Sequence, residues 1–162
     1  KCLTHLTHIH RGAFHPLQIE LMRECFENLK ENSTVEKKSK ILIVRDYEKA
    51  RSFELCSGTE YLKKNGFVVY DFDLIKLEEQ IEIMQSAKIV VAAHGAGLTH
   101  AANMSPESRL IEIMPSDSIH PLYWYLSAQS KIKYSMLVTK VTDNQQRLGF
   151  SDIEIADHLE CQ

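Results

Sequence analysis

Residues Lys88 to Asn103 read KIVVAAHGAGLTHAAN, and the rest of the chain is organised around this stretch. Five apolar residues, Ile89 to Ala93, lead directly into His94-Gly95-Ala96-Gly97. A short continuous apolar run bounded by glycine is typical of a buried strand in a parallel sheet. We expect the two glycines, which have no Cβ, to let the backbone turn sharply and approach a ligand closely. Leu98 to Met104 then predicts a helix whose first N–H groups lack partners inside it, and such an end suits an anion or phosphate.

Strands and helices alternate on both sides of this stretch. Apolar runs predict further strands at 41–44, 67–70, 110–114 and 134–138. Helical spacing predicts helices from Pro16 to about Glu31 and over 50–64, 77–87, 122–130 and 151–160. This alternation indicates right-handed βαβ units and a parallel sheet covered on both faces, which is an α/β, Rossmann-like fold. We divide the chain into three segments. Residues 1–38 are predicted to hold a helix and the remnant of an upstream domain or linker, 39–140 form the Rossmann-like domain, and 141–162 are a tail with one helix.

Composition excludes several classes of protein. The 162 residues are 44% hydrophobic and 25% charged, which is ordinary for one soluble globular domain. A formal net charge of −3 provides no global basic field to recruit nucleic acid. No apolar run approaches the roughly 20 residues that span a bilayer. The four scattered cysteines form no CxxC pair, so neither a zinc knuckle nor a redox dithiol is indicated, and the compartment stays open.

The HGAG turn does not match the two best-known phosphate-binding loops. It is not GxGxxG, and no Gly-Lys-Ser/Thr follows it. What remains is a loop of exposed N–H groups with an imidazole at its entrance, suited to a pyrophosphate or to sugar hydroxyls. His94 is a candidate to donate to a phosphate oxygen or to transfer a proton near neutral pH. The alternative, a tight turn that the histidine merely caps, fits the spacing equally well.

Two arginines and a glutamate are further candidates. Arg45 ends the strand at 41–44 and Arg51 follows closely, at the carboxyl edge where open α/β sheets place ligands. A guanidinium binds phosphate through two parallel hydrogen bonds, whereas the alternative is a surface ion pair with a neighbouring acidic residue. Glu112 interrupts an apolar strand, and an unpaired buried carboxylate is costly. It therefore either points to a site, accepting from ribose hydroxyls, or reaches solvent at an edge.

Histidines and aromatic residues elsewhere have more ordinary interpretations. His5, His8 and His10 favour a polar strand or linker over a metal site, because no acidic or cysteine partner is near in sequence. His100 is predicted to lie on a helix surface. Trp124 and its neighbours Tyr123 and Tyr125 are expected in the core or at an interface, with stacking on a base as the alternative.

The order of these features resembles the carboxyl-terminal half of glycosyltransferase family 61. The resemblance runs from about Ile41 to Pro115. Its elements, in order, are Arg45, Arg51, Gly66-Phe67-Val68-Val69, Glu79-Gln80-Ile81, Ser86-Ala87-Lys88-Ile89-Val90, His94-Gly95-Ala96-Gly97-Leu98-Thr99 and Leu110-Ile111-Glu112-Ile113. That family includes protein O-GlcNAc and O-mannose-glycan GlcNAc transferases, plant β-1,2-xylosyltransferases and bacterial polysaccharide enzymes. Two positions depart from the family pattern: Leu55-Cys56 replaces an Asn-Glu pair, and His100 replaces an asparagine.

The resemblance implies a GT-B architecture in which this chain supplies the carboxyl-terminal, nucleotide-sugar-binding domain. The implied reaction is inverting transfer of a sugar from a nucleotide diphosphate sugar, usually UDP-linked, to an acceptor hydroxyl on a glycan or protein, with no metal or other cofactor. The implied partners are the donor, the acceptor and an upstream GT-B domain; nucleic acid is not among them. The implied donor-binding residues are Arg45, Arg51, His94, Gly95, Ala96, Gly97, Leu98, Thr99 and Glu112.

The resemblance leaves several points open. The catalytic base is unassigned, with His94 as a candidate, and the compartment is the cytoplasm or the ER/Golgi lumen. A non-catalytic nucleotide- or sugar-binding module of the same fold is the alternative function. A hydrolase using His94 as base ranks last, since no GxSxG elbow is present.

Overall fold

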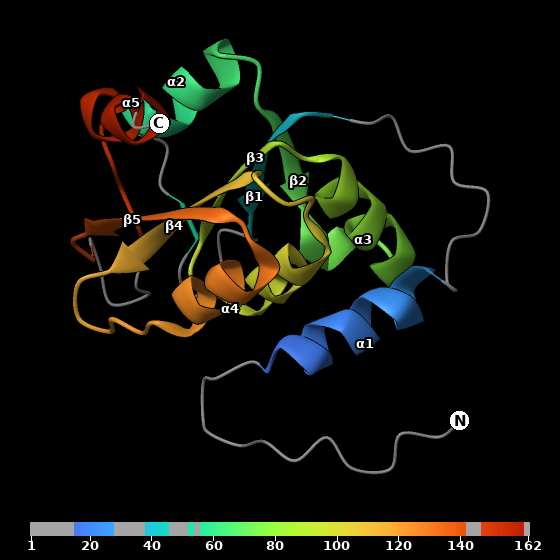
Figure 1. Cartoon of the computed structure of the whole chain (residues 1–162). Helices are drawn as coiled ribbons and strands as arrows, with labels where there is room; N and C mark the ends of the chain where they lie inside the picture. The colour runs from blue at the N-terminus through green and yellow to red at the C-terminus, as the bar shows by residue number, and fades with distance from the viewer. Residues whose placement is uncertain (1–14, 28–37, 46–51, 54–55, 142–146, 161–162) are drawn as a thin grey trace.

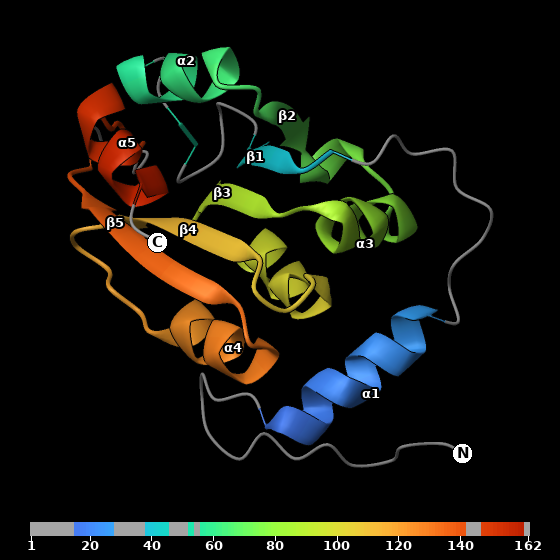
Figure 2. The same ribbon diagram turned by 45° about the horizontal axis from the view of Figure 1, so that its top comes forward.

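A five-stranded parallel sheet forms the centre of the molecule. The computed structural model of the chain describes residues 15–27, 38–45, 52–53, 56–141 and 147–160. Within them the strand order is β2-β1-β3-β4-β5, and all four neighbouring pairs are parallel (Figures 1 and 2). The strands are β1 (Lys40–Val44), β2 (Val68–Asp71), β3 (Ile89–Ala93), β4 (Arg109–Pro115) and β5 (Lys133–Thr139). The predicted α/β, Rossmann-like fold is therefore confirmed.

Helices cover both faces of the sheet (Figure 2). One face carries α1, α3, η2 and α4, at Pro16–Glu27, Leu77–Ser86, Ala96–Asn103 and Leu122–Ser130. The other face carries α2 and α5, at Ser57–Lys64 and Asp152–Glu160. A short 3₁₀ helix, η1 (Phe72–Leu74), follows β2. Among the described residues, none of these helices combines the length and apolar character needed to cross a membrane.

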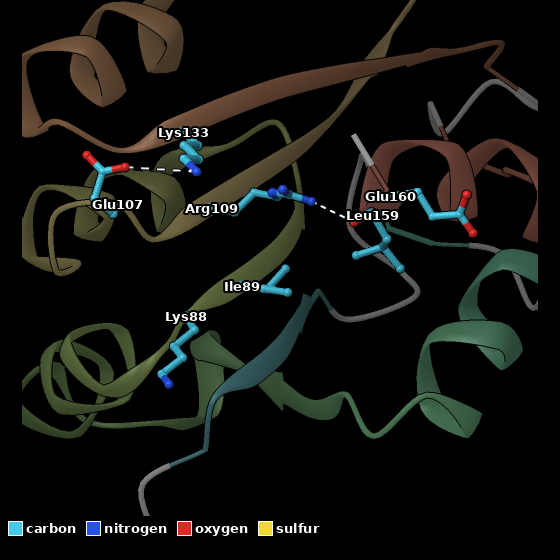
Figure 3. Close-up of a pocket in the computed structure, with 7 residues that line it drawn as sticks. All are labelled: Lys88, Ile89, Glu107, Arg109, Lys133, Leu159 and Glu160. Atoms are coloured by element: carbon cyan, nitrogen blue, oxygen red, sulfur yellow. Dashed lines mark hydrogen bonds and ion pairs between the residues drawn. The ribbon is translucent and has the colours of Figure 1, made fainter. Parts of the chain in front are cut away.

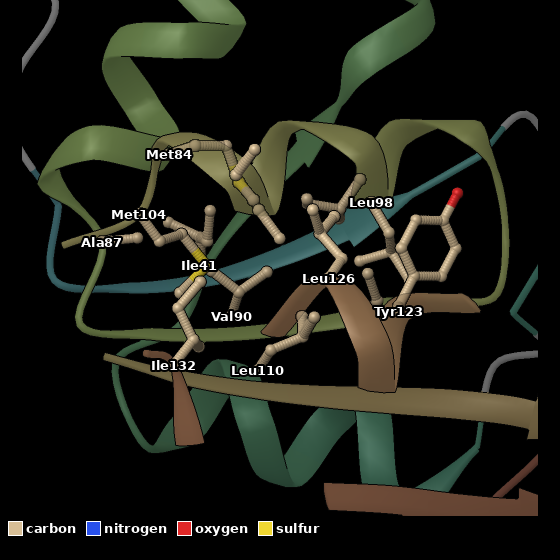
Figure 4. Close-up of a cluster of buried hydrophobic side chains, with 14 of the residues drawn as sticks. Ile41, Met84, Ala87, Val90, Leu98, Met104, Leu110, Tyr123, Leu126 and Ile132 are labelled. Atoms are coloured by element: carbon tan, nitrogen blue, oxygen red, sulfur yellow. The ribbon is translucent and has the colours of Figure 1, made fainter. Parts of the chain in front are cut away.

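Two apolar clusters hold the layers together. Neighbouring residues of a strand point to opposite faces, so Ile41 belongs to one cluster and Leu42 to the other. The first cluster joins the strands to α3, η2 and α4, through residues such as Met84, Leu98 and Leu126 (Figure 4). The second joins them to α2 and α5. Because both faces are covered, the central strands read as continuous apolar runs, which is why sequence alone locates them.

The helix α2 begins later than predicted. A helix over 50–64 was expected, but Ser52 and Phe53 are not helical, and α2 begins at Ser57. Phe53 instead forms a parallel bridge with Leu148, and its ring packs edge-on against Phe150, 5.5 Å away between centroids. This long-range pairing overrides local helical spacing. The predicted end of the helix is confirmed, since Gly66 follows it with a positive φ of 82°.

The helix after the HGAG turn also differs from the prediction. It is the 3₁₀ helix η2, which begins at Ala96 rather than at Leu98. The other described strands and helices overlap their predicted ranges, with ends that differ by a few residues. The prediction for Pro16 to Glu31 is matched as far as Glu27, because 28–37 lie outside the described residues.

Candidate functional site

A small hollow lies where the carboxyl ends of β1 and β3 meet. The chain leaves β1 toward β2 on one side, and β3 lies on the other, so the sheet order changes direction between β1 and β3. Loops diverge at such a point, and open α/β sheets bind ligands there. The hollow measures about 80 Å³, and its lining includes Val44 and Arg45 from the end of β1, Asp73 from η1, and Gly95, Ala96 and Gly97 from the HGAG turn. The topology thus brings Arg45 and the HGAG turn together.

Gly95 lies close to the side chain of Arg45 and does not have an unusual backbone conformation. Its φ of 169° is extended backbone, which any residue adopts, whereas Gly66, with a φ of 82°, has a left-handed conformation. The backbone does bend at His94 and Gly95, directly before η2. A Cβ built on Gly95 would lie 3.3 Å from Nη1 of Arg45. The guanidinium of Arg45 is thus the nearest group to the open side of Gly95, and the predicted close approach of a ligand stays a prediction.

Three residues of the turn, Gly95, Ala96 and Gly97, line the same hollow. The amide of Leu98 donates to the carbonyl of Gly95 at 3.0 Å, which closes the first turn of η2. The amides of Ala96 and Gly97 donate to no residue in the described part of the chain. The hydroxyl of Tyr123 on α4 also donates to the Gly95 carbonyl, at 2.6 Å. The carbonyl of Gly95 is therefore held by two donors, and Ala96, Gly97 and Arg45 are among the residues that line the hollow.

His94 is held by Glu112 from the neighbouring strand. Its Nδ1 lies 2.5 Å from Oε1 of Glu112, and its own amide donates to the carbonyl of Ile113 at 2.9 Å. The His94 side chain is 10% exposed. Its ring packs edge-on against Tyr123, with centroids 5.5 Å apart, and stacks at 6.0 Å on the exposed ring of His120. The ring orientation is thus fixed by contacts from β4, α4 and the loop between them.

Glu112 is fully buried and paired on both oxygens. Oε1 bonds His94, and Oε2 accepts from the hydroxyl of Tyr134 on β5 at 2.5 Å. The alternative in which Glu112 reaches solvent is therefore wrong. Both oxygens of the carboxylate are thus engaged by side chains of the protein, and one of them holds His94 at the start of the turn. Burial, followed by the hydrogen bond to Glu112, raises the pKa of Tyr134 far above its ordinary value, which keeps the phenol protonated as the donor.

The structure gives less information on how the remaining candidate residues relate to the site. Leu98 is buried in the first apolar cluster, so only its backbone can serve the site, and Thr99 is half-buried. Arg51 lies outside the described residues, as do the histidines at positions 5, 8 and 10. His100 packs edge-on against Phe72, with centroids 6.2 Å apart, and burial lowers its pKa.

Three residues around the site were not predicted to serve it: Tyr123, Tyr134 and His120. Tyr123 was expected in the core, where it lies, but its hydroxyl also anchors the turn. The one sequence signal for Tyr134 was Glu112 itself, because a buried carboxylate needs donors from an adjacent strand. His120 carries no such signal, since its position beside His94 depends on the fold.

A larger pocket lies at the opposite edge of the sheet, at the amino ends of β3, β4 and β5 (Figure 3). It measures about 590 Å³. Two of its cations have partners within the protein: Arg109 donates to the carbonyl of Leu159 at 2.7 Å, and Lys133 lies 3.9 Å from Glu107. None of the predicted donor-binding residues that the structure describes lines it. We therefore place the candidate site at the carboxyl edge. Among the described residues, no group of three His, Cys, Asp or Glu side chains is arranged to hold a metal ion.

Comparison with known proteins finds similarity to glycosyltransferases. Residues 1–111 match the family model described as Glycosyltransferase 61. Over 63 residues, or 39% of this chain, the sequence is 33% identical to "Beta-1,2-xylosyltransferase RCN11" of Oryza sativa subsp. japonica. Over 97 residues, or 52% of this chain, it is 24% identical to "Beta-1,2-xylosyltransferase" of Arabidopsis thaliana. These matches cover 12% and 17% of the two plant proteins, so the chain corresponds to a small part of each.

Proposed function

The chain belongs to the Glycosyltransferase 61 family, and on that premise we propose that it is the donor-binding part of a glycosyltransferase. The reaction is inverting transfer of a sugar from a nucleoside diphosphate sugar, UDP-linked, to a hydroxyl of a glycan or protein. Both plant relatives are named β-1,2-xylosyltransferases, so UDP-xylose is the donor to test first. An upstream GT-B domain supplies the acceptor side of the cleft.

One observation carries this proposal: Arg45 lies against Gly95, beside the amides of Ala96 and Gly97, at the point where the sheet order changes direction. As the bond to the sugar breaks, negative charge develops on the leaving diphosphate. Fixed N–H dipoles and a guanidinium stabilise such charge without rearranging during the reaction. Arg45 and the two amides therefore match the leaving group in charge and in hydrogen-bonding character.

The size of the hollow indicates which part of the donor it holds. At about 80 Å³ it is far smaller than the roughly 300 Å³ of a typical small-molecule pocket. We assign it to the diphosphate, with the sugar and nucleoside extending beyond it. Because Arg45 and the amides offset the charge, we expect donor binding to persist in a metal chelator.

Calorimetric titration of the chain with UDP tests the binding site. Arg45→Ala removes a charged hydrogen-bond donor, which is worth about 1.5–3 kcal/mol and corresponds to roughly 10- to 100-fold weaker binding. Lys88→Ala is the matched control, because Lys88 is an exposed cation at the opposite edge of the sheet. We expect this control to bind UDP as the unmodified chain does. Equal losses in the two variants would reject the site.

A transfer assay tests the reaction itself. The complete gene product is incubated with labelled UDP-xylose, and then with other UDP-sugars, together with glycan and protein acceptors. We expect Arg45-dependent transfer of one of these sugars. Binding that depends on Arg45, with no transfer from any donor, would support the alternative of a non-catalytic binding module.

A further inference from the structure

The side-chain amide of Gln80 on α3 holds the loop that contains η1. Its Nε2 donates to the carbonyls of Phe72 and Ile75, both at 2.7 Å. Both partners are carbonyl oxygens, which only accept, so the nitrogen rather than the oxygen of the amide must face them. Gln80 lies in the Glu79-Gln80-Ile81 element of the family resemblance, and the proposed donor site assigns it no role.

The loop's own hydrogen bonds are local, and one of them is long. The amide of Ile75 donates to the carbonyl of Phe72 at 3.4 Å, beyond the usual range of about 2.7–3.2 Å. The amide of Asp73 donates to Oδ1 of Asp71 at 3.0 Å. Both bonds join residues of the same short segment, whereas the Gln80 amide connects that segment to the following helix. Gln80 therefore fixes η1 relative to α3.

The loop that Gln80 holds forms one wall of the candidate diphosphate hollow. Phe72 and Asp73 both line the hollow, and Gln80 is not among its lining residues. Phe72 is buried and lies against the HGAG turn, since a Cβ built on Gly97 would be 3.7 Å from its Cδ2. Gln80 can therefore influence a ligand in the hollow only through η1.

We propose that Gln80 is a positioning residue for the donor. By holding η1 against the HGAG turn, it keeps the wall of the hollow in the conformation that binds the diphosphate. This inference rests on the proposed donor site and adds to it a residue that does not touch the donor. A wall that is already ordered in the free chain loses little conformational freedom when the ligand binds. Without the Gln80 amide, part of the binding free energy is spent on ordering η1.

Gln80→Met removes the donor group and changes little else. Methionine has a similar length and a similar helix propensity, so α3 is expected to keep its shape. Gln85→Met is the matched control, because Gln85 lies on the same helix and is half-buried like Gln80. Within the described part of the chain, the Gln85 side chain makes no hydrogen bond. If Gln80→Met does not fold, Gln80→Ala and Gln85→Ala replace this pair of variants.

Calorimetric titration with UDP measures the effect on affinity. We expect Gln80→Met to bind UDP about tenfold more weakly, which corresponds to one ordinary hydrogen bond. Gln85→Met should bind UDP as the unmodified chain does. A purely structural role of Gln80 predicts a lower stability in urea, with unchanged UDP affinity under conditions in which the variant is folded.

Amide hydrogen exchange shows whether the loss of affinity acts through η1. In Gln80→Met the amides of Asp73 and Ile75 should exchange faster than in the unmodified chain, because the loop opens more often. Saturating UDP should slow both amides again, since a ligand that binds only the closed form disfavours the open one. A loop that lies outside the binding site would exchange faster in the variant without responding to UDP.

The outcomes separate this inference from the proposed function. Failure of the unmodified chain to bind UDP, or binding that Arg45→Ala leaves unchanged, rejects the donor site itself. Arg45-dependent binding with equal affinity in Gln80→Met overturns only the role of Gln80. An equal loss in Gln85→Met, or exchange at Asp73 and Ile75 that UDP does not slow, overturns it too. Weaker binding in Gln80→Met alone, with both amides slowed by UDP, establishes it.

Discussion

Gly95 lies so close to Arg45 that a Cβ on the glycine would sit 3.3 Å from Nη1 of the guanidinium. The two residues come from adjacent parallel strands, Arg45 directly after β1 and Gly95 two residues after β3. The glycine therefore leaves room for the arginine to lie over the turn. The position of the Arg45 guanidinium therefore depends on the glycine at the second position of the HGAG turn.

Substitution Gly95→Ala is expected to weaken UDP binding by displacing Arg45. We expect a loss of about tenfold, near the lower value for a charged hydrogen bond. The check is a double-mutant cycle measured by calorimetry. Gly95→Ala should have little further effect when Arg45 is already alanine. Additive losses in the double variant would show that the glycine acts independently of the arginine.

Gly58→Ala is expected to destabilise the contact between α2 and the segment before α5. A Cβ at Gly58 would lie 2.2 Å from Cδ2 of Phe150 and 2.7 Å from its carbonyl oxygen. Overpacking of this kind costs about 1–3 kcal/mol or more. Gly97→Ala is the control, since its Cβ would meet only Phe72, at 3.7 Å. Urea unfolding should show a clear loss for the first variant and a change near zero for the second.

Ile19 tests whether α1 belongs to the sheet domain or only precedes it. The side chain is 2% exposed and packs into the first apolar cluster, while Leu17 on the same helix is 52% exposed. Arg23 supports the same packing, because its Nε donates to the carbonyl of Ala102 at 2.7 Å. Ile19→Ala should cost about 2–5 kcal/mol in the free energy of unfolding. Leu17→Ala should cost far less, and equal small effects would place α1 outside the cooperative unit.

His100 makes the stability of the chain depend on pH. Burial lowers its pKa below the ordinary 6.5, so the folded state binds this proton less readily than the unfolded state does. The stability from a neutral His100 is present above pH 6.5 and is lost as the pH falls through the lowered value. Replacement of His100 by asparagine should reduce the fall in the free energy of unfolding at acid pH, as measured by urea unfolding at several pH values. If the free energy of unfolding falls equally in the variant, other groups cause the loss of stability at acid pH.

The sheet and the HGAG turn were predictable because their signals are local. Ile89 to Ala93 form a buried strand with the predicted bounds, since a strand covered on both faces must be apolar throughout. The carboxyl edge was predictable for the same reason: Arg45 and His94 each follow an apolar run. The topology then brings Arg45 and the turn together.

Features that depend on distant residues were not predictable. Phe53 leaves the expected helix because it pairs with Leu148, and no local pattern reveals that partner. The burial of Glu112 is stabilised by Tyr134, which lies on another strand. The role of Gly95 depends on the side chain of Arg45 rather than on its own backbone angles.

The most direct test of the donor site is to map UDP binding on the isotope-labelled chain by NMR. If the turn holds the diphosphate, the amide signals of Gly95, Ala96 and Gly97 should shift most on titration, together with the side-chain signal of Arg45. Shifts concentrated instead at Lys88, Arg109 and Lys133, which line the pocket at the opposite edge of the sheet, would contradict the account.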